Sequence, residues 1–207
     1  MASIPEPKEL PMSAAVVSRP LVTLALPQKG MARLATQIFL AVLGTLLLTL
    51  SAKTRVVLGP VDMSLQTLVV LLIGASFGMR LGVATLLLYL AEGAIGFPVF
   101  QATPEKGIGI AYMLGSTGGY LAGFVVMAAI AGWAADRGWD RNVLKLLAAM
   151  IVAEIVMMAM GWAWLSTLIG ADKAWTFGVL PFILPDAVKV ALAACLLPAA
   201  WSLGRRG

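Results

Sequence analysis

Long apolar stretches alternate with short polar ones along most of the 207-residue chain. The apolar stretches cover residues 34–50, 65–77, 81–97, 108–133, 144–168 and 179–201. A helix needs about 20 consecutive apolar residues to cross the hydrocarbon core of a bilayer. The pattern therefore predicts an all-α integral membrane protein, a bundle of about six transmembrane helices.

The second and third apolar stretches are separated only by Gly78, Met79 and Arg80. Three residues suffice for nothing but a tight reversal, so both helices must be short, tilted or partly broken. Short, glycine-interrupted segments point to a binding region in transporters. By contrast, residues 1–30 hold five prolines and scattered charges, and their apolar run 21–26 is too short to span a bilayer. This composition predicts a mobile N-terminal tail.

Six spans would put both termini on one side of the membrane, and the cations favour that side ten to four, with Lys189 left inside the bilayer. The ten are Lys8, Arg19, Lys29, Arg33, Arg80, Arg137, Arg141, Lys145, Arg205 and Arg206, against Lys53, Arg55, Lys106 and Lys173. Because cytoplasmic loops are enriched in Lys and Arg, we expect both termini, and the tail over residues 1–30, in the cytoplasm. The loops around 53–62, 96–107 and 170–178 would then face outward.

The amino-acid composition excludes several classes of function. The chain is 60% hydrophobic and 12% charged, with no histidine and a single cysteine, Cys195. The absence of histidine and the presence of only one cysteine exclude disulfide frameworks, His-ligated metals and Ser-His or Cys-His catalysis. We therefore expect no metal, cofactor or catalytic residue. The absence of a Gly-Lys dipeptide excludes a phosphate-binding Walker A loop. The net charge of +5 is scattered over loops, which argues against nucleic acid as a partner.

Asp186 and Lys189 are the most informative residues, because they lie three positions apart inside an apolar stretch. This spacing places both side chains on one face of a helix. Charged side chains within a bilayer are costly and usually mark a substrate or ion pathway. The alternative is a structural ion pair that fixes two helices together.

Other polar groups also lie within apolar stretches. Gln66 offers donors and acceptors at the outer end of the second predicted helix, and Glu92 lies one turn from Tyr89 in the third. In the fourth stretch, Gly118 and Gly119 expose backbone beside Tyr120, either for a ligand or for tight packing.

The fifth stretch holds the remaining membrane acid, Glu154, and two tryptophans further along. Trp164 could cover an apolar ring of a ligand or anchor its helix at the interface.

Four motifs resemble the BioY family, the biotin-specific substrate-binding subunits of energy-coupling-factor transporters. They occupy residues 63–68 (MSLQTL), 93–100 (GAIGFPVF), 115–124 (GSTGGYLAGF) and 186–189 (DAVK). The resemblance implies a six-helix substrate-binding domain over residues 31–203 in the bacterial cytoplasmic membrane. Its ligand would be biotin, and its partners a transmembrane coupling subunit and paired ATPases.

The resemblance also implies residue roles. Asp186 and Lys189 match a family motif associated with holding biotin. Lys106, in the segment 103–107 (TPEKG), would meet the biotin carboxylate, although the family pattern there is a glycine-rich loop with a basic residue. Ser116 stands where the family often has proline.

Two other functions stay open. A stand-alone proton-coupled carrier of a small carboxylate-bearing vitamin would use Asp186, Lys189, Glu154 and Glu92 as a relay. An intramembrane enzyme would need a nucleophile such as serine beside Lys189, and no serine lies within a helical turn of it.

Overall fold

Long helices build almost the whole molecule. The computed structural model describes residues 20–24, 26–27, 30–57 and 62–204. The main helices are α1 (Met31–Lys53), α2 (Gln66–Ala94), α3 (Gly109–Met113), α4 (Gly118–Asp136), α5 (Val143–Ile169), α6 (Ala171–Gly178) and α7 (Ile183–Gly204). Three short 3-10 helices and a two-stranded hairpin complete the described chain: η1 (Leu21–Leu24), η2 (Trp139–Arg141), η3 (Leu180–Phe182), β1 (Arg55–Val57) and β2 (Asp62–Ser64). The prediction of an all-α membrane bundle is confirmed, since five helical segments are long and apolar enough to span a bilayer.

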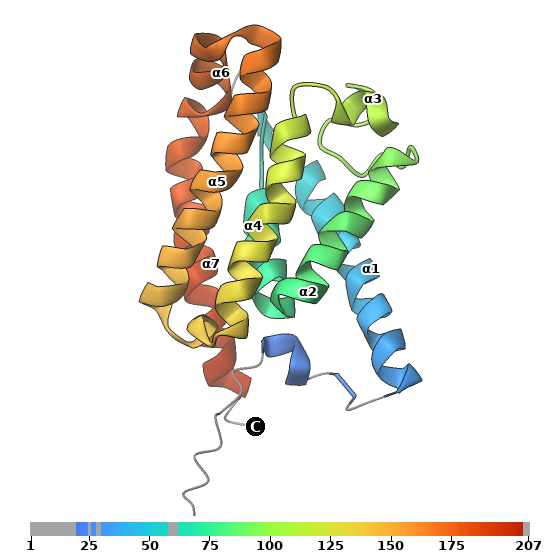
Figure 1. Ribbon diagram of the computed structural model, residues 1–207, viewed down its shortest axis with the longest axis vertical. Helices are drawn as coiled ribbons and strands as arrows, with labels where there is room; N and C mark the ends of the chain where they lie inside the picture. The colour runs from blue at the N-terminus through green and yellow to red at the C-terminus, as the bar shows by residue number, and fades with distance from the viewer. Residues whose placement is uncertain (1–19, 25, 28–29, 58–61, 205–207) are drawn as a thin grey trace, which may run out of the picture.

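One of these segments, α2, is a hairpin of two helical arms. Gly78 has φ 77° and ψ 172° in the middle of α2, a conformation open to glycine and to few other residues. Gly74 and Gly82 meet across the hairpin, where a Cβ on Gly82 would stand 3.2 Å from the Gly74 Cα. The tight reversal predicted at 78–80 is therefore confirmed, and Figure 1 shows the two arms running in opposite directions. When the two arms are counted separately, the described part of the bundle has six apolar helical segments.

The expected single helix over 108–133 is wrong, because the chain breaks between α3 and α4. The Trp164 Nε1 atom on α5 donates a hydrogen bond of 2.8 Å to the Gly115 carbonyl oxygen and holds the turn in place. Gly118 is required where α4 begins, since a Cβ there would lie 2.2 Å from the Met113 carbonyl oxygen. Residues 114–117, between α3 and α4, are therefore outside any helix, and helical periodicity does not set where their side chains point.

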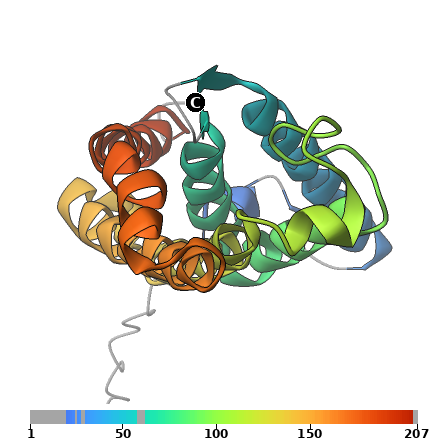
Figure 2. The same ribbon diagram turned by 90° about the horizontal axis from the view of Figure 1, so that it is seen from above.

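Two segments expected as loops are regular structure instead. Residues 55–64 contain the antiparallel pair β1–β2, and residues 171–178 form α6, which folds back at the end of α5. From above, α6 and the α3 region cover the same end of the bundle (Figure 2). Both termini of the described chain lie at the opposite end (Figure 1).

Glycines let α4 pack closely against both neighbours at the centre of the bundle. Gly74 of α2 faces Ala128, and a Cβ on Gly74 would lie 2.7 Å from its carbonyl oxygen. On the other side of α4, Gly123 packs against Met157 of α5. Lipid supplies no hydrophobic drive between helices, so this close backbone approach provides the packing. The bundle thus holds α2, α4 and α5 in fixed relative positions.

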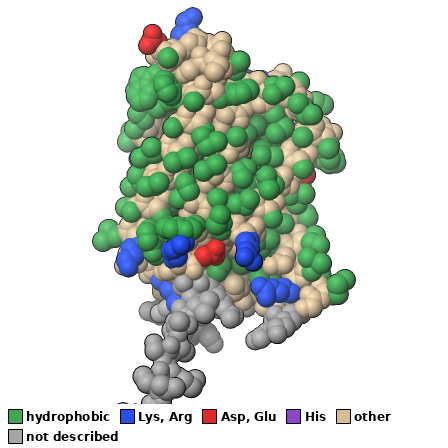
Figure 3. Space-filling view, in the orientation of Figure 1, with side chains coloured by type: hydrophobic (Ala, Val, Ile, Leu, Met, Phe, Trp, Pro, Cys, Tyr) green, Lys and Arg blue, Asp and Glu red, His purple; other side chains and the backbone are tan. Residues whose placement is uncertain are grey.

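The end that carries the termini is fastened by polar contacts. Trp201 of α7 donates a hydrogen bond from Nε1 to Asp140 Oδ2 in η2, and both side chains are buried. Of the predicted tail, residues 1–19 lie outside the described chain, while Leu21–Leu24 forms η1 against α2 with Val22 buried. Lys and Arg side chains gather at this end, below the apolar flank of the bundle (Figure 3).

Candidate ligand-binding site

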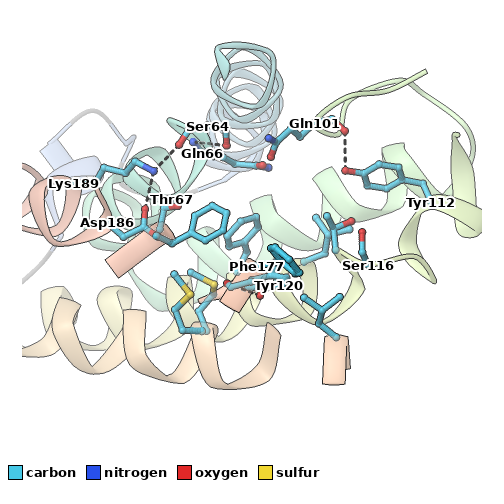
Figure 4. Close-up of a pocket in the computed structure, with 18 of the residues that line it drawn as sticks. Ser64, Gln66, Thr67, Gln101, Tyr112, Ser116, Tyr120, Phe177, Asp186 and Lys189 are labelled. Carbon is cyan, nitrogen blue, oxygen red and sulfur yellow. Dashed lines mark hydrogen bonds and ion pairs between the residues drawn. The ribbon is translucent and has the colours of Figure 1, made fainter. Parts of the chain in front are cut away.

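A cavity of about 290 Å³ lies between α2, α4, α5, α6 and α7, in the half of the bundle away from the termini. Its lining includes the polar residues Ser64, Gln66, Thr67, Gln101, Tyr112, Ser116, Thr117, Tyr120, Asp186 and Lys189. Figure 4 shows these side chains around the cavity, with the ion pair at one end and Gln101, Tyr112 and Ser116 toward the other. The cavity is therefore polar at both ends.

The first end is an ion pair on α7. Lys189 Nζ lies 2.7 Å from Asp186 Oδ1 and donates a second hydrogen bond of 2.7 Å to the Ser64 carbonyl oxygen. Asp186 is 2% exposed and Lys189 is 7% exposed. Because Lys189 uses only Oδ1, the other carboxylate oxygen can accept from a ligand donor. The prediction that the three-residue spacing brings the two side chains together is confirmed.

Gln66 lies beside this end and is oriented by a short chain of hydrogen bonds. Its Nε2 atom donates to the Tyr89 hydroxyl at 2.8 Å, and that hydroxyl donates to the Val99 carbonyl oxygen at 2.9 Å. The amide nitrogen is thus engaged, which leaves the amide oxygen of Gln66 as an acceptor. Tyr89 also packs edge-on against Phe100, with ring centroids 5.3 Å apart.

The opposite end carries uncharged polar groups. Gln101 comes from the loop after α2, and Ser116 and Thr117 come from the turn before α4. The Tyr112 hydroxyl donates to the Gln101 carbonyl oxygen at 2.8 Å, and its ring stacks on Phe100 at 5.2 Å. Among the described lining residues, the only positive charge is the one at the ion-pair end.

The middle of the cavity is apolar and aromatic. Phe124, Met157, Met158 and Phe177 line it, together with the ring of Tyr120. The Tyr120 hydroxyl donates a 2.7 Å hydrogen bond to the carbonyl oxygen of the last α6 residue, so the ring is held in the wall and α6 is held over the cavity. Such a middle section suits an apolar ring or chain.

Four of the nine predicted site residues line the cavity, namely Gln66, Tyr120, Asp186 and Lys189. The structure places the other five elsewhere: Glu92, Lys106, Gly118, Gly119 and Trp164 are absent from the described lining.

Contacts within the bundle account for four of those five positions, and exposure on a loop accounts for the fifth. Glu92 accepts a 3.0 Å hydrogen bond from Thr45 of α1, on the other side of its helix. Trp164 packs directly against Gly118 and Gly119, so that a Cβ added to Gly119 would lie 2.4 Å from the Cβ of Trp164. Lys106 is exposed on the loop that leads to α3.

Several lining residues were missed by sequence reasoning. Thr67 lies within the motif over 63–68, and Ser116 and Thr117 lie within the motif over 115–124, so these motifs held the signal. Gln101 lies on a loop with no periodic pattern, and only the fold brings it to the cavity.

Comparison with known proteins gives a consistent result. The model of the BioY family matches residues 19–206. A probable biotin transporter BioY from Pyrococcus horikoshii is 39% identical over 159 residues, which cover 77% of this chain and 92% of that protein. The biotin transporter BioY of Thermotoga maritima is 31% identical, over 77% of this chain and 92% of its own length.

A solved structure supports the fold. The crystal structure of the S-component for biotin from an ECF-type ABC transporter superposes with a TM-score of 0.73 at 20% identity. The superposition covers 84% of this chain and 95% of the solved one. Because the family model matches residues 19–206, nearly the whole chain, this protein belongs to the BioY family.

Proposed function

We propose that this protein captures biotin as the substrate-specific subunit of an ECF transporter. The observation that carries the proposal is the cavity with an ion pair at one end, uncharged donors at the other and an apolar middle. Biotin has the same division, because a ureido ring and a carboxylate flank an apolar sulfur ring and a methylene chain. The family relatives named as biotin transporters support this assignment.

We infer that biotin lies with its ureido ring at the Asp186–Lys189 end. A carboxylate and the Gln66 oxygen accept the two ureido N–H groups, while an ammonium can donate to the ureido carbonyl. The valerate chain then passes the aromatic middle, and its carboxylate meets the hydroxyl and amide groups of Ser116, Thr117 and Gln101. Lys106 is exposed and is not among the described lining residues, which favours neutral donors at the biotin carboxylate.

The experiment is equilibrium binding of labelled biotin to the protein purified in detergent. We expect saturable binding of one biotin per chain, strongly weakened by Asp186→Asn. The matched control is Asp172→Asn on α6, since Asp172 is exposed and outside the lining, and it should bind as the wild type does. A folded wild-type sample that retains no biotin would overturn the proposal.

We propose a coupling subunit and paired ATPases as partners, which is supported by the likeness to the S-component of an ECF-type ABC transporter. The sequence has no Walker A loop, so we expect no ATP hydrolysis by the purified protein, and ATP-dependent uptake only after addition of a coupling subunit and its ATPases. Biotin uptake by the protein alone that collapses with the proton gradient would favour the carrier alternative instead.

We also propose that the protein lies in the bacterial cell membrane with both termini on the cytoplasmic side. The Lys and Arg side chains at that end of the bundle support this orientation (Figure 3). Tags at either terminus should be protected from external protease in intact cells, and cleavage of either one would contradict it.

A further inference from the structure

Glu154 is an acid on α5 that stands behind the ion pair rather than in the ligand cavity. It lines a separate apolar groove of about 530 Å³ between α5, α6 and α7. Asp186 lines both this groove and the ligand cavity. Asp186 therefore stands between the groove that Glu154 lines and the cavity where biotin would bind.

The Glu154 carboxyl group has few polar or charged neighbours among the described residues. Both of its oxygens are buried, and no N–H or hydroxyl group of the described residues donates a hydrogen bond to either of them. The charged groups that act on it are Asp186 and Lys189 of α7. On the other helices packed against α5, α4 has no charged residue before its last position, and Asp172 and Lys173 of α6 are exposed. Asp140 and Arg141 of η2 lie just before the first residue of α5.

Burial and charge together decide which carboxyl group of the cluster holds a proton. An unpaired carboxylate costs far more to bury than a neutral carboxylic acid. Lys189 already donates to Asp186 and to the Ser64 carbonyl oxygen, so ionised Glu154 would leave the cluster with a surplus negative charge in an apolar wall. Two carboxylates at one site resolve this conflict when one is protonated.

We propose that Glu154 is a positioning residue of the biotin site: it stays protonated and donates its O–H to the Asp186 carboxylate from behind. This inference rests on the proposed function. Lys189 holds one oxygen of Asp186, and the Glu154 hydrogen bond fixes the orientation of the whole carboxylate toward the ligand. A neutral donor adds no charge, so Asp186 stays ionised and matched to a single ammonium.

Infrared difference spectroscopy and biotin binding test the proposal on the full-length protein in detergent. The wild type should show the C=O stretch of a protonated carboxylic acid, which Glu154→Gln removes and Glu105→Gln, at an exposed position on the loop before α3, leaves in place. Addition of biotin should shift this band in the wild type, because Asp186 is shared between the ligand and Glu154.

Biotin binding by two variants tests whether Glu154 acts as a hydrogen-bond donor or only fills space beside Asp186. Glu154→Gln keeps an N–H donor of similar size and should bind biotin within about threefold of the wild type, whereas Glu154→Leu should weaken binding about tenfold or more. Unfolding temperatures establish which variants are folded, and the glutamine variant keeps the test decisive if the leucine variant does not fold.

Each contrary result has a distinct meaning. If the wild type binds biotin but shows no protonated-acid band that depends on Glu154, the inference is overturned and the proposed function stands. Lost binding in folded Glu154→Gln would show that the ionised carboxylate is required and would also overturn it. A wild type that binds no biotin overturns the proposed function itself.

Discussion

The substitution Asp186→Asn separates a ligand site from a structural ion pair. In the structure the Asp186 side chain is almost fully buried and accepts a 2.7 Å hydrogen bond from Lys189. In the proposed binding mode, the amide in its place would present only a neutral acceptor to the ureido N–H. A hydrogen bond to a charged group is worth about 1.5–3 kcal/mol, so we expect the Kd for biotin to rise about 10- to 150-fold.

Labelled biotin binding to the purified variants, together with their unfolding temperatures, measures this effect. Lys189→Met should also weaken binding, because it removes the proposed donor to the ureido carbonyl and the observed hydrogen bond to the Ser64 carbonyl oxygen. Asp172→Asn serves as the control for the chemical change alone, since Asp172 is exposed on α6.

The double variant Asp186→Asn, Lys189→Met gives the refuting result. If the pair only holds α7 in place, each single variant leaves an uncompensated buried charge and folds poorly, at a cost of about 3–5 kcal/mol. The double variant would then regain both stability and tight biotin binding. Such recovery would refute a role for the two side chains in binding, whereas folded single variants with weak binding support it.

Three further predictions concern other parts of the bundle. Gly78→Ala should lower the free energy of unfolding by about 1–3 kcal/mol, because the backbone there needs glycine, and an unchanged unfolding temperature would contradict the hairpin geometry. Burial raises the pKa of Asp140 despite the hydrogen bond from Trp201, so stability should fall as pH rises from about 3.9 through that raised pKa. Asp140→Asn should flatten this slope in thermal melts, and a slope equal to that of the wild type would show that another group causes it. Lys53 Nζ donates hydrogen bonds to Phe100 and Thr103 and so holds the loop that carries Gln101. Lys53→Met should therefore speed the release of labelled biotin several-fold in a chase with unlabelled biotin. An unchanged release rate would show that these hydrogen bonds do not retain biotin.

Local sequence determined the features that depend on neighbours along the chain. Apolar stretches of membrane-spanning length gave the helices, and the three residues around Gly78 allowed only a reversal. The pairing of Asp186 with Lys189 followed from helical geometry alone, since residues three apart share a face. These predictions needed no knowledge of which helix lies beside which.

Local sequence failed where a break depended on a distant partner. The turn before α4 is held by a hydrogen bond from Trp164, which lies 49 residues further along the chain from Gly115. Apolar composition over 108–133 could not reveal that contact. As a result, Ser116 and Thr117 looked like part of a helix, while in the structure they line the cavity.

Tertiary structure alone decided which polar side chains face the cavity. Helical periodicity tells which residues share a face, but the rotation of each helix against its neighbours sets what that face meets. Glu92 turned toward Thr45 of α1, and Glu154 came to lie behind Asp186 rather than beside the cavity. Gln101 reached the site on a loop, where no period constrains a side chain. The sequence by itself thus determined the helices and the central ion pair, and packing between helices decided the rest of the site.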